Sequence, residues 1–253
     1  TNVSAGTLRL GASNRIADTS AVTVASGATF DLNSFTETIA SITSDGLVTF
    51  GTGNTLTTTG AQTYNGQVTG GAVTLVSSGG GAISATNTSN DFTGTLAITT
   101  NGGAADIVDA NALNIGTSSV GTLTAQTLSN NLTLGGSVTA SGSGDAIVLA
   151  ASGNFINTGN YSLTPGTGRW LVYSSDPALA NFGGLASGNL ALWNKTYAGN
   201  PPASITQTGN RYLFGTALTL TFTSTDLTKT YGDDVTGSLP TRYATSGANT
   251  NAY

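Results

Sequence analysis

Short segments in which apolar and polar residues alternate follow one another through the middle of the chain. Gly, Ser, Asn and Thr separate these segments, and each is too short to bury its apolar side chains alone. A period of two residues is typical of a β-strand with one buried face. We therefore expect strands at Leu96–Ile98, Leu113–Ile115, Leu123–Ala125, Leu132–Leu134, Val138–Ala140 and Ile147–Leu149.

The spacing of these segments predicts how they stack. Leu113–Gly116 and Leu132–Gly135 match position by position 19 residues apart, and Leu96–Thr99 precedes the first of them by 17 residues. A repeat of about 20 residues that holds two or three strands is typical of a β-solenoid, in which each coil pairs only with its neighbours. The sequence therefore predicts an all-β rod, with roughly eight coils of this length in its first 160 or so residues.

The first 54 residues show the same design with regular glycine turns. The stretches Ser4–Gly11, Ala21–Asn33 and Glu37–Ile42 resemble the repeats of autotransporter passengers. That resemblance implies a secreted, right-handed parallel β-helix on a bacterial surface. The strands that we expect here are Thr7–Leu10, Ala21–Val24, Thr29–Leu32, Thr38–Ile42 and Leu47–Phe50.

The composition changes near Tyr161. All five prolines lie beyond it, as do five of the seven basic residues. Proline cannot donate a hydrogen bond to a strand ladder and is confined to edges and loops, so we expect the regular coils to end near this point. We divide the chain into solenoid repeats (1–162), an aromatic and proline-containing cap or transition segment (163–215) and a truncated all-β module (216–253).

The last two parts carry a second resemblance. Gly168–Pro177, Leu192–Tyr197 and Gly209–Phe214 are similar to the segment that closes the solenoid in filamentous haemagglutinin-like exoproteins, which are exported by two-partner secretion. Ala217–Asp233 looks like the opening of the small β modules that follow in such proteins, and Lys229–Asp233 (Lys-Thr-Tyr-Gly-Asp) is the most specific part. The resemblance implies an extracellular location on the bacterial surface and an outer-membrane secretion partner. We expect the chain to be a piece of a longer protein.

Composition and charge exclude several functions. The chain has no Cys, His or Met, which removes thiolate chemistry, the commonest general base and the usual zinc or copper ligands. No Lys or Arg lies between Ile16 and Gly168, where eight acidic residues fall, so we expect no nucleic-acid surface. No apolar run approaches the eighteen or so residues of a membrane span, so we expect no membrane insertion.

Acidic residues offer little for catalysis or metal binding. Asp106 and Asp109 are the closest acidic pair in the repeats, but a separation of three residues on a strand sends them to opposite faces. Ser141–Asp145 (Ser-Gly-Ser-Gly-Asp) resembles one unit of a calcium-binding repeat and occurs once. We expect no catalytic residues, no cofactor, no metal site and no enzyme activity.

Five aromatic residues raise the question of a carbohydrate site. Flat rings beside polar groups can stack on sugar rings, but large rings can equally form the core of a cap. Alternation predicts that Arg169, Leu171 and Tyr173 share one face of their strand and that Trp170 and Val172 share the other. The cap-core interpretation is favoured, and the candidate carbohydrate contacts are Trp170, Tyr173, Trp193, Tyr197 and Tyr212.

The sequence therefore favours a structural and adhesive segment of a secreted bacterial surface or matrix adhesin. Its partners would be host or matrix glycans, or other surface proteins. One alternative is a β-helix that binds or degrades polysaccharides, which would need acids converging in a groove. Another is an ice-binding solenoid, which would need threonine pairs at one fixed place in every coil. The Thr-x-Thr pairs of this chain, such as Thr57–Thr59 and those within Thr219–Thr223, do not recur at a constant spacing, so we expect no such order.

Overall fold

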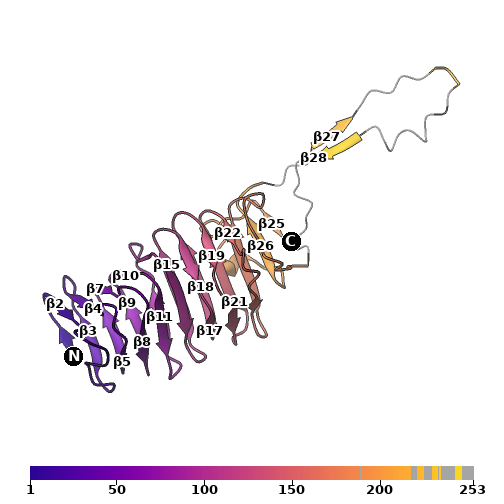
Figure 1. The fold of residues 1–253 in the computed structure, drawn as a ribbon. Coiled ribbons are helices and arrows are strands. Elements are labelled where there is room, and N and C mark those ends of the chain that lie inside the picture. The colour runs from indigo at the N-terminus through magenta and orange to yellow at the C-terminus, as the bar shows by residue number, and fades with distance from the viewer. Residues whose placement is uncertain (189, 218–220, 225–229, 233, 235–242, 247–253) are drawn as a thin grey trace.

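The computed structural model describes residues 1–188, 190–217, 221–224, 230–232, 234 and 243–246. Up to Phe214 the chain winds into a parallel β-solenoid of about 10 turns (Figure 1). The only helix in these ranges is a single 3-10 turn, η1 (Pro202–Ser204). The prediction of an all-β solenoid is therefore confirmed. Within the same ranges, no helix has the length and apolar character needed to cross a membrane.

Sheet A runs along the whole solenoid and has 11 strands. In spatial order its strands are β1 (Asn2–Val3), β3 (Ala21–Val24), β6 (Ser41–Ser44), β9 (Gln62–Tyr64), β12 (Ile83–Ala85), β15 (Ala104–Asp109), β18 (Thr122–Thr127), β21 (Asp145–Ala150), β24 (Arg169–Ser174), β26 (Arg211–Phe214) and β25 (Leu192–Trp193).

Two further parallel sheets form the other walls. Sheet B consists of β2 (Thr7–Arg9), β4 (Thr29–Asp31), β7 (Leu47–Thr49), β10 (Val68–Gly70) and β13 (Asp91–Phe92). Sheet C consists of β5 (Glu37–Ile39), β8 (Asn54–Thr58), β11 (Val73–Ser77), β14 (Thr95–Thr99), β16 (Leu113–Ile115), β19 (Leu132–Leu134) and β22 (Phe155–Ile156), with a side branch of β17 (Ser118–Val120), β20 (Val138–Ala140) and β23 (Leu163–Thr164).

The pairing register follows the repeat seen in the sequence. Leu113 pairs with Leu132 and Ile115 with Leu134, as the 19-residue match predicts. The preceding coil keeps the same 19-residue offset, so Leu96 pairs with Ile115 and not with Leu113. The 17-residue spacing of the apolar triplets therefore does not set the register at this step.

Stacked inward side chains form the core. One inward row of sheet A runs Val22, Ile42, Gln62, Ile83, Ala105, Leu123, Ile147 and Trp170. Each fully buried aliphatic side chain contributes on the order of 1.5–3 kcal/mol. Gln62 is the polar member, and its amide donates to the carbonyl of Val76 at 2.8 Å and accepts from the Tyr64 hydroxyl at 2.9 Å. The buried amide is therefore satisfied within the core.

One of the predicted strands is divided into two strands in the structure. Thr38–Ile42 was expected to be continuous, but β5 ends at Ile39 and β6 begins at Ser41. Ala40 and Ser41 are both only partly buried, so the alternation loses its phase here and the chain turns from sheet C to sheet A. A corner in a solenoid can thus be as short as one residue.

Sheet B ends because a side chain caps it. Thr93 donates its N–H back to Gly70 of the preceding coil, so the N–H of Phe92 faces the next coil. There it donates to Oδ2 of Asp109 at 2.7 Å, while Oδ1 of the same carboxylate accepts from the N–H of Asn111 at 2.7 Å. Beyond this cap β14 pairs with both β16 and β17, so later coils turn within sheet C.

Hydroxyl side chains line up on the outside of sheet C more regularly than the sequence suggested. The register places one outward residue of each coil in a single row: Thr38, Thr57, Val76, Thr99, Ser119, Thr139 and Thr164. A second row, Thr55, Thr74 and Ala97, spans three coils. Only Thr55 and Thr57 form a pair across the two rows, because Thr74 lies beside Val76 and Ala97 lies beside Thr99. The register thus orders single residues along this wall, and the threonine pairs take no fixed place in every coil, as expected.

The parallel ladder continues beyond the predicted end of the regular coils. β24 pairs with β21, and β26 pairs with β24, both in parallel. The first 160 residues hold eight strands of sheet A, which agrees with the roughly eight coils predicted there, and the strands beyond them bring the solenoid to about 10 turns. Pro177 and Pro201 do not interrupt the ladder because they lie in the long connection between β24 and β26.

Beyond the solenoid, β27 (Thr221–Ser224) pairs with β28 (Tyr243–Ser246) in antiparallel fashion. This pair falls in the part predicted as a truncated β module. Lys229 and Asp233 of the Lys-Thr-Tyr-Gly-Asp signature lie outside the described residues.

The cap of sheet B generates a pH prediction. Burial raises the pKa of the Asp109 carboxyl above its ordinary value, although the hydrogen bonds from Phe92 and Asn111 oppose the rise. The folded chain then holds this proton more tightly than the unfolded chain, so Asp109 contributes less stability as the pH rises from about 4 through the raised pKa. We expect the stability of Asp109→Asn relative to the parent chain to increase over that interval.

The measurement is the free energy of unfolding from urea titrations of both proteins at a series of pH values. Groups common to both proteins cancel in the difference, which isolates position 109. A difference that is independent of pH, or that falls as the pH rises, would contradict the account of this cap.

Candidate functional site

The outer face of sheet A changes character over the last coils. Its outward row is polar from Thr23 through Thr43, Thr63, Ser84 and Asp106 to Thr124, and then continues as Val148 and Leu171. An outward-facing apolar residue on an open sheet would meet water, so these last positions require a cover. The connection between β24 and β26, residues 175–210, supplies it, and we call it the covering segment.

A second small core forms under the covering segment. Val148 and Ala150 of β21, Leu171 and Tyr173 of β24 and Leu213 of β26 pack there with Ile205 of the covering segment. Leu192 and Tyr197 pack against this core and stay partly buried. The last coils are thus buried on both faces of sheet A.

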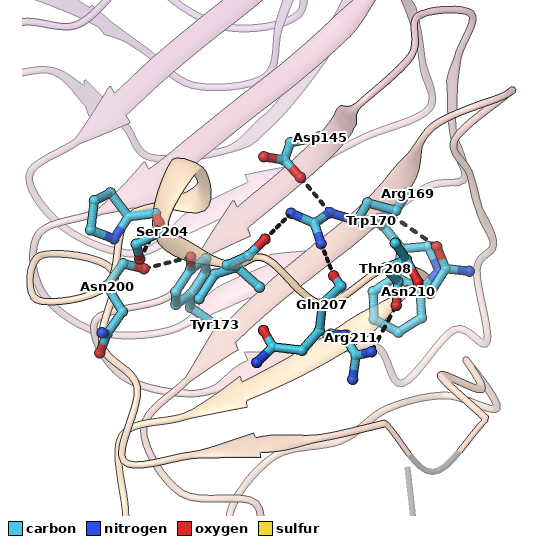
Figure 2. Close-up of polar contacts among 12 residues, drawn as sticks. Asp145, Arg169, Trp170, Tyr173, Asn200, Ser204, Gln207, Thr208, Asn210 and Arg211 are labelled. Carbon is cyan, nitrogen blue, oxygen red and sulfur yellow. Dashed lines mark hydrogen bonds and ion pairs between the residues drawn. The ribbon is translucent and has the colours of Figure 1, made fainter.

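Arg169 fastens the covering segment to the sheet. Its Nε lies 2.5 Å from Oδ1 of Asp145 on the neighbouring strand β21, and its side chain is 15% exposed. The other two guanidinium nitrogens donate to the backbone carbonyls of Ile205, at 2.7 Å, and of Gln207 (Figure 2). One planar cation therefore links two strands and the covering segment, which a lysine at this position could not do.

Further hydrogen bonds hold the same segment along its length. The Tyr173 hydroxyl donates to the carbonyl of Asn200 at 2.8 Å (Figure 2). Arg211 donates to the carbonyls of Leu190, at 2.9 Å, and Thr208, at 2.7 Å. The N–H of Trp170 donates to Oδ1 of Asn210 at 2.9 Å. Polar contacts therefore hold the covering segment from Leu190 to Asn210.

The five candidate aromatic residues fall into different environments. Trp170 and Tyr212 are buried inside the solenoid, with ring centroids 4.9 Å apart in a T-shaped arrangement. Tyr173 is buried in the second core on the opposite face of β24, as alternation predicts. Trp193 packs on Phe214 at 5.0 Å and is half-buried, and so is Tyr197, which meets Tyr173 edge to face at 5.3 Å.

A groove lies between the covering segment and the ends of β18, β21 and β24. Its volume is about 330 Å³, and Tyr173 and Tyr197 are the aromatic residues that line it. Gln126 lines it from β18, Lys195 from the covering segment, and five hydroxyl residues complete the polar lining: Thr127, Ser152, Ser174, Ser175 and Thr196. The groove thus brings together two of the five candidate residues and leaves Trp170, Trp193 and Tyr212 outside.

The groups in the groove can make polar contacts. Burial raises the pKa of the Tyr197 hydroxyl, and the negative charge of Asp106 adds to the rise, so this hydroxyl stays protonated at neutral pH and can donate. The backbone N–H of Lys195 donates to Phe214 at 2.8 Å, which fixes the start of its side chain. Its ammonium group has no hydrogen-bond or ion-pair partner within the described part of the chain.

Gln126 and Lys195 were not found from the sequence. They lie far apart in the chain, and the docking of the covering segment brings them together. Neither belongs to a recognisable motif. The one usable signal was the appearance of apolar residues at outward positions of β21 and β24, which predicts that something covers this face.

Other candidate positions do not form sites. Asp106 is exposed and Asp109 is buried on the other face of β15, as their spacing predicts. Asp145, the acid of the single Ser-Gly-Ser-Gly-Asp unit, is paired with Arg169. Among the described residues, no three acidic side chains come together as metal ligands would. A second, more open groove of about 410 Å³ is lined by this same Asp145–Arg169 pair, whose charges satisfy each other.

The fastening role of Arg169 can be tested by Arg169→Gln. Loss of hydrogen bonds from a largely buried charged group should lower the free energy of unfolding by about 2–3 kcal/mol. Amide hydrogens between residues 200 and 208 should exchange faster, as measured by hydrogen–deuterium exchange. Lys195→Gln removes the same charge without removing a contact and should leave this exchange unchanged. Equal exchange in Arg169→Gln and the parent chain would refute the role.

Comparison with known proteins adds no family to this description. No protein-family model, no curated protein and no solved structure matches the chain. What the chain shows is therefore its fold, a parallel β-solenoid of about 10 turns.

Proposed function

We propose that the chain is a structural and adhesive segment of a secreted bacterial surface or matrix adhesin, and that the groove beside Tyr197 is where it contacts glycans. The observation that carries this proposal is the convergence of a half-buried tyrosine, an amide, hydroxyls and a free ammonium in one groove. Aromatic rings and polar groups in this combination suit sugar rings, which have an apolar face and a polar rim. These are groups for binding, and we propose binding without turnover.

The solenoid supports the structural half of the proposal. Each coil pairs only with its neighbours, so the length of such a rod grows with the number of coils, by about 4.8 Å for each. The outward rows carry mostly hydroxyl side chains, which keep a surface with few charges hydrated. A rod of this kind is suited to holding a groove away from a cell surface.

Location and export belong to the same proposal. The resemblance of the chain to filamentous haemagglutinin-like exoproteins supports an extracellular position, export through an outer-membrane partner, and glycans of a host or of the matrix as ligands. Other surface proteins are the alternative partners, and they would bind without regard to the groove.

The hydroxyl row of sheet C keeps one alternative open. An ice-binding face needs regularly spaced hydroxyls, and the row from Thr38 to Thr164 meets that need in one dimension. The second row spans only three coils, so the two-dimensional order of a flat ice-binding face is partial. Thermal hysteresis of the parent chain, abolished by Thr57→Leu together with Thr99→Leu, would favour this alternative over the groove.

The proposal is tested by glycan-array binding of the parent chain and of Tyr197→Ala. We expect the parent chain to bind a set of glycans and Tyr197→Ala to bind them roughly tenfold less, which corresponds to about 1.4 kcal/mol. Tyr197→Phe keeps the ring and should keep the binding. Tyr231→Ala removes a fully exposed tyrosine outside the groove and should also keep it.

Two results would overturn the proposal. One is a folded parent chain, judged by circular dichroism, that binds no glycan on the array. The other is binding that Tyr197→Ala and Tyr231→Ala change to the same extent, because that result would locate recognition outside the groove.

A further inference from the structure

Lys195 is the one cation of the described ranges that is partly buried and has no hydrogen-bond or ion-pair partner for its charged group; the Arg15 side chain also has none, but Arg15 is exposed. Arg9 pairs with Asp31, and Arg169 pairs with Asp145. Arg211 donates to two backbone carbonyls. Lys195 is half-buried in a concave site, and its charge meets no acid or carbonyl there. An ammonium that has no partner and lies beside a groove can donate charge-assisted hydrogen bonds to an anionic group of a ligand.

The rest of the groove is uncharged. Its lining consists of Gln126, Leu128, the two tyrosines, hydroxyl residues and small residues, and Lys195 is its one ionised group. Two acids outside the lining act on it: the charge of Asp106 raises the pKa of Tyr197, and the charge of Asp145, which is paired with Arg169, raises the pKa of Tyr173. The groove therefore has a positive charge at one position, beside neutral hydrogen-bonding groups.

Charge and size limit the ligand. The whole chain has a formal net charge of −5, so a densely charged polyanion would be repelled while a ligand with a single negative charge would not. A volume of about 330 Å³ lies at the lower end of the range for ligand pockets, which suits one or two sugar rings.

We propose that the groove binds an acidic saccharide unit, a hexuronate linked to a neutral sugar, with its carboxylate on the Lys195 ammonium. The sugar ring lies against Tyr197, and the Gln126 amide and the hydroxyl side chains contact the sugar hydroxyls. This inference rests on the proposed function and adds the chemical class of the ligand. It makes Lys195 the specificity-determining residue of the groove and Tyr197 its platform.

A matched pair of disaccharides tests this inference. Cellobiouronic acid and cellobiose differ only in whether carbon 6 of one ring is a carboxylate or a hydroxymethyl group. Dissociation constants for both are measured by ligand-observed NMR titration of the full chain. We expect cellobiouronate to bind roughly tenfold more tightly than cellobiose, as one charge-assisted contact supplies. The preference should decline with rising salt concentration.

Two variants of equal net charge locate the effect. Lys195→Gln should reduce cellobiouronate binding to the level of cellobiose and leave cellobiose binding unchanged. Arg15→Gln removes the same charge from an exposed position in the first coil and should leave both affinities as in the parent chain. An equal loss in both variants would mean that overall charge and not the groove determines the preference.

The remaining outcomes separate this inference from the proposed function. Equal binding of both disaccharides, or tighter binding of cellobiose 6-sulfate than of cellobiouronate, overturns the carboxylate inference alone. The carboxylate inference alone is also overturned if neutral glycans bind through Tyr197 on the array while cellobiouronate does not bind. An array on which nothing binds overturns both proposals.

Discussion

The parallel backbone ladder between successive coils is the constraint on which the rest of the structure depends. It fixes which residue of one coil lies over which residue of the next, as in the pairing of Leu113 with Leu132. Because the register is shared by both faces, the inward side chains stack as a continuous apolar core and the outward ones stack as rows of hydroxyls. A change of one residue in the register would exchange the two faces, so the alternation in the sequence and the ladder support each other.

The groove lies where the outward positions of sheet A are no longer polar. Over β21 and β24 the outward positions become apolar, and Leu192, Tyr197 and Ile205 of the covering segment pack on them. Arg169 ties this covering segment to Asp145, and the Tyr173 hydroxyl ties it to Asn200. The groove lies where the cover stops short of the strand ends, so its lining combines outward residues of the coils with residues of the covering segment. The outer face of sheet A is polar in the early coils and apolar in the last ones. The covering segment packs on the apolar part, and the groove forms beside it.

The sequence predicted the features that recur in every coil, and it did not predict the contacts that occur only once. Alternation identified the inward and outward positions of β16, β19 and β24 correctly, because each strand contains its own signal. The corner at Ala40, the capping of sheet B by Asp109 and the continuation of the ladder to Phe214 each depend on a partner in another coil. The same holds for the groove. Tyr173 and Tyr197 could be identified from the sequence as aromatic residues beside polar groups. Gln126 and Lys195 could not, because they come together only when the covering segment packs on the coils.

Hydrogen–deuterium exchange of the full chain, with and without saturating cellobiouronate, tests the central claim that the covering segment and the last coils form one binding groove. The account predicts slower exchange at residues 126–128 and at residues 195–198 together, with no change in the N-terminal coils. Protection confined to the outer rows of sheet C, or protection of only one side of the groove, would contradict it.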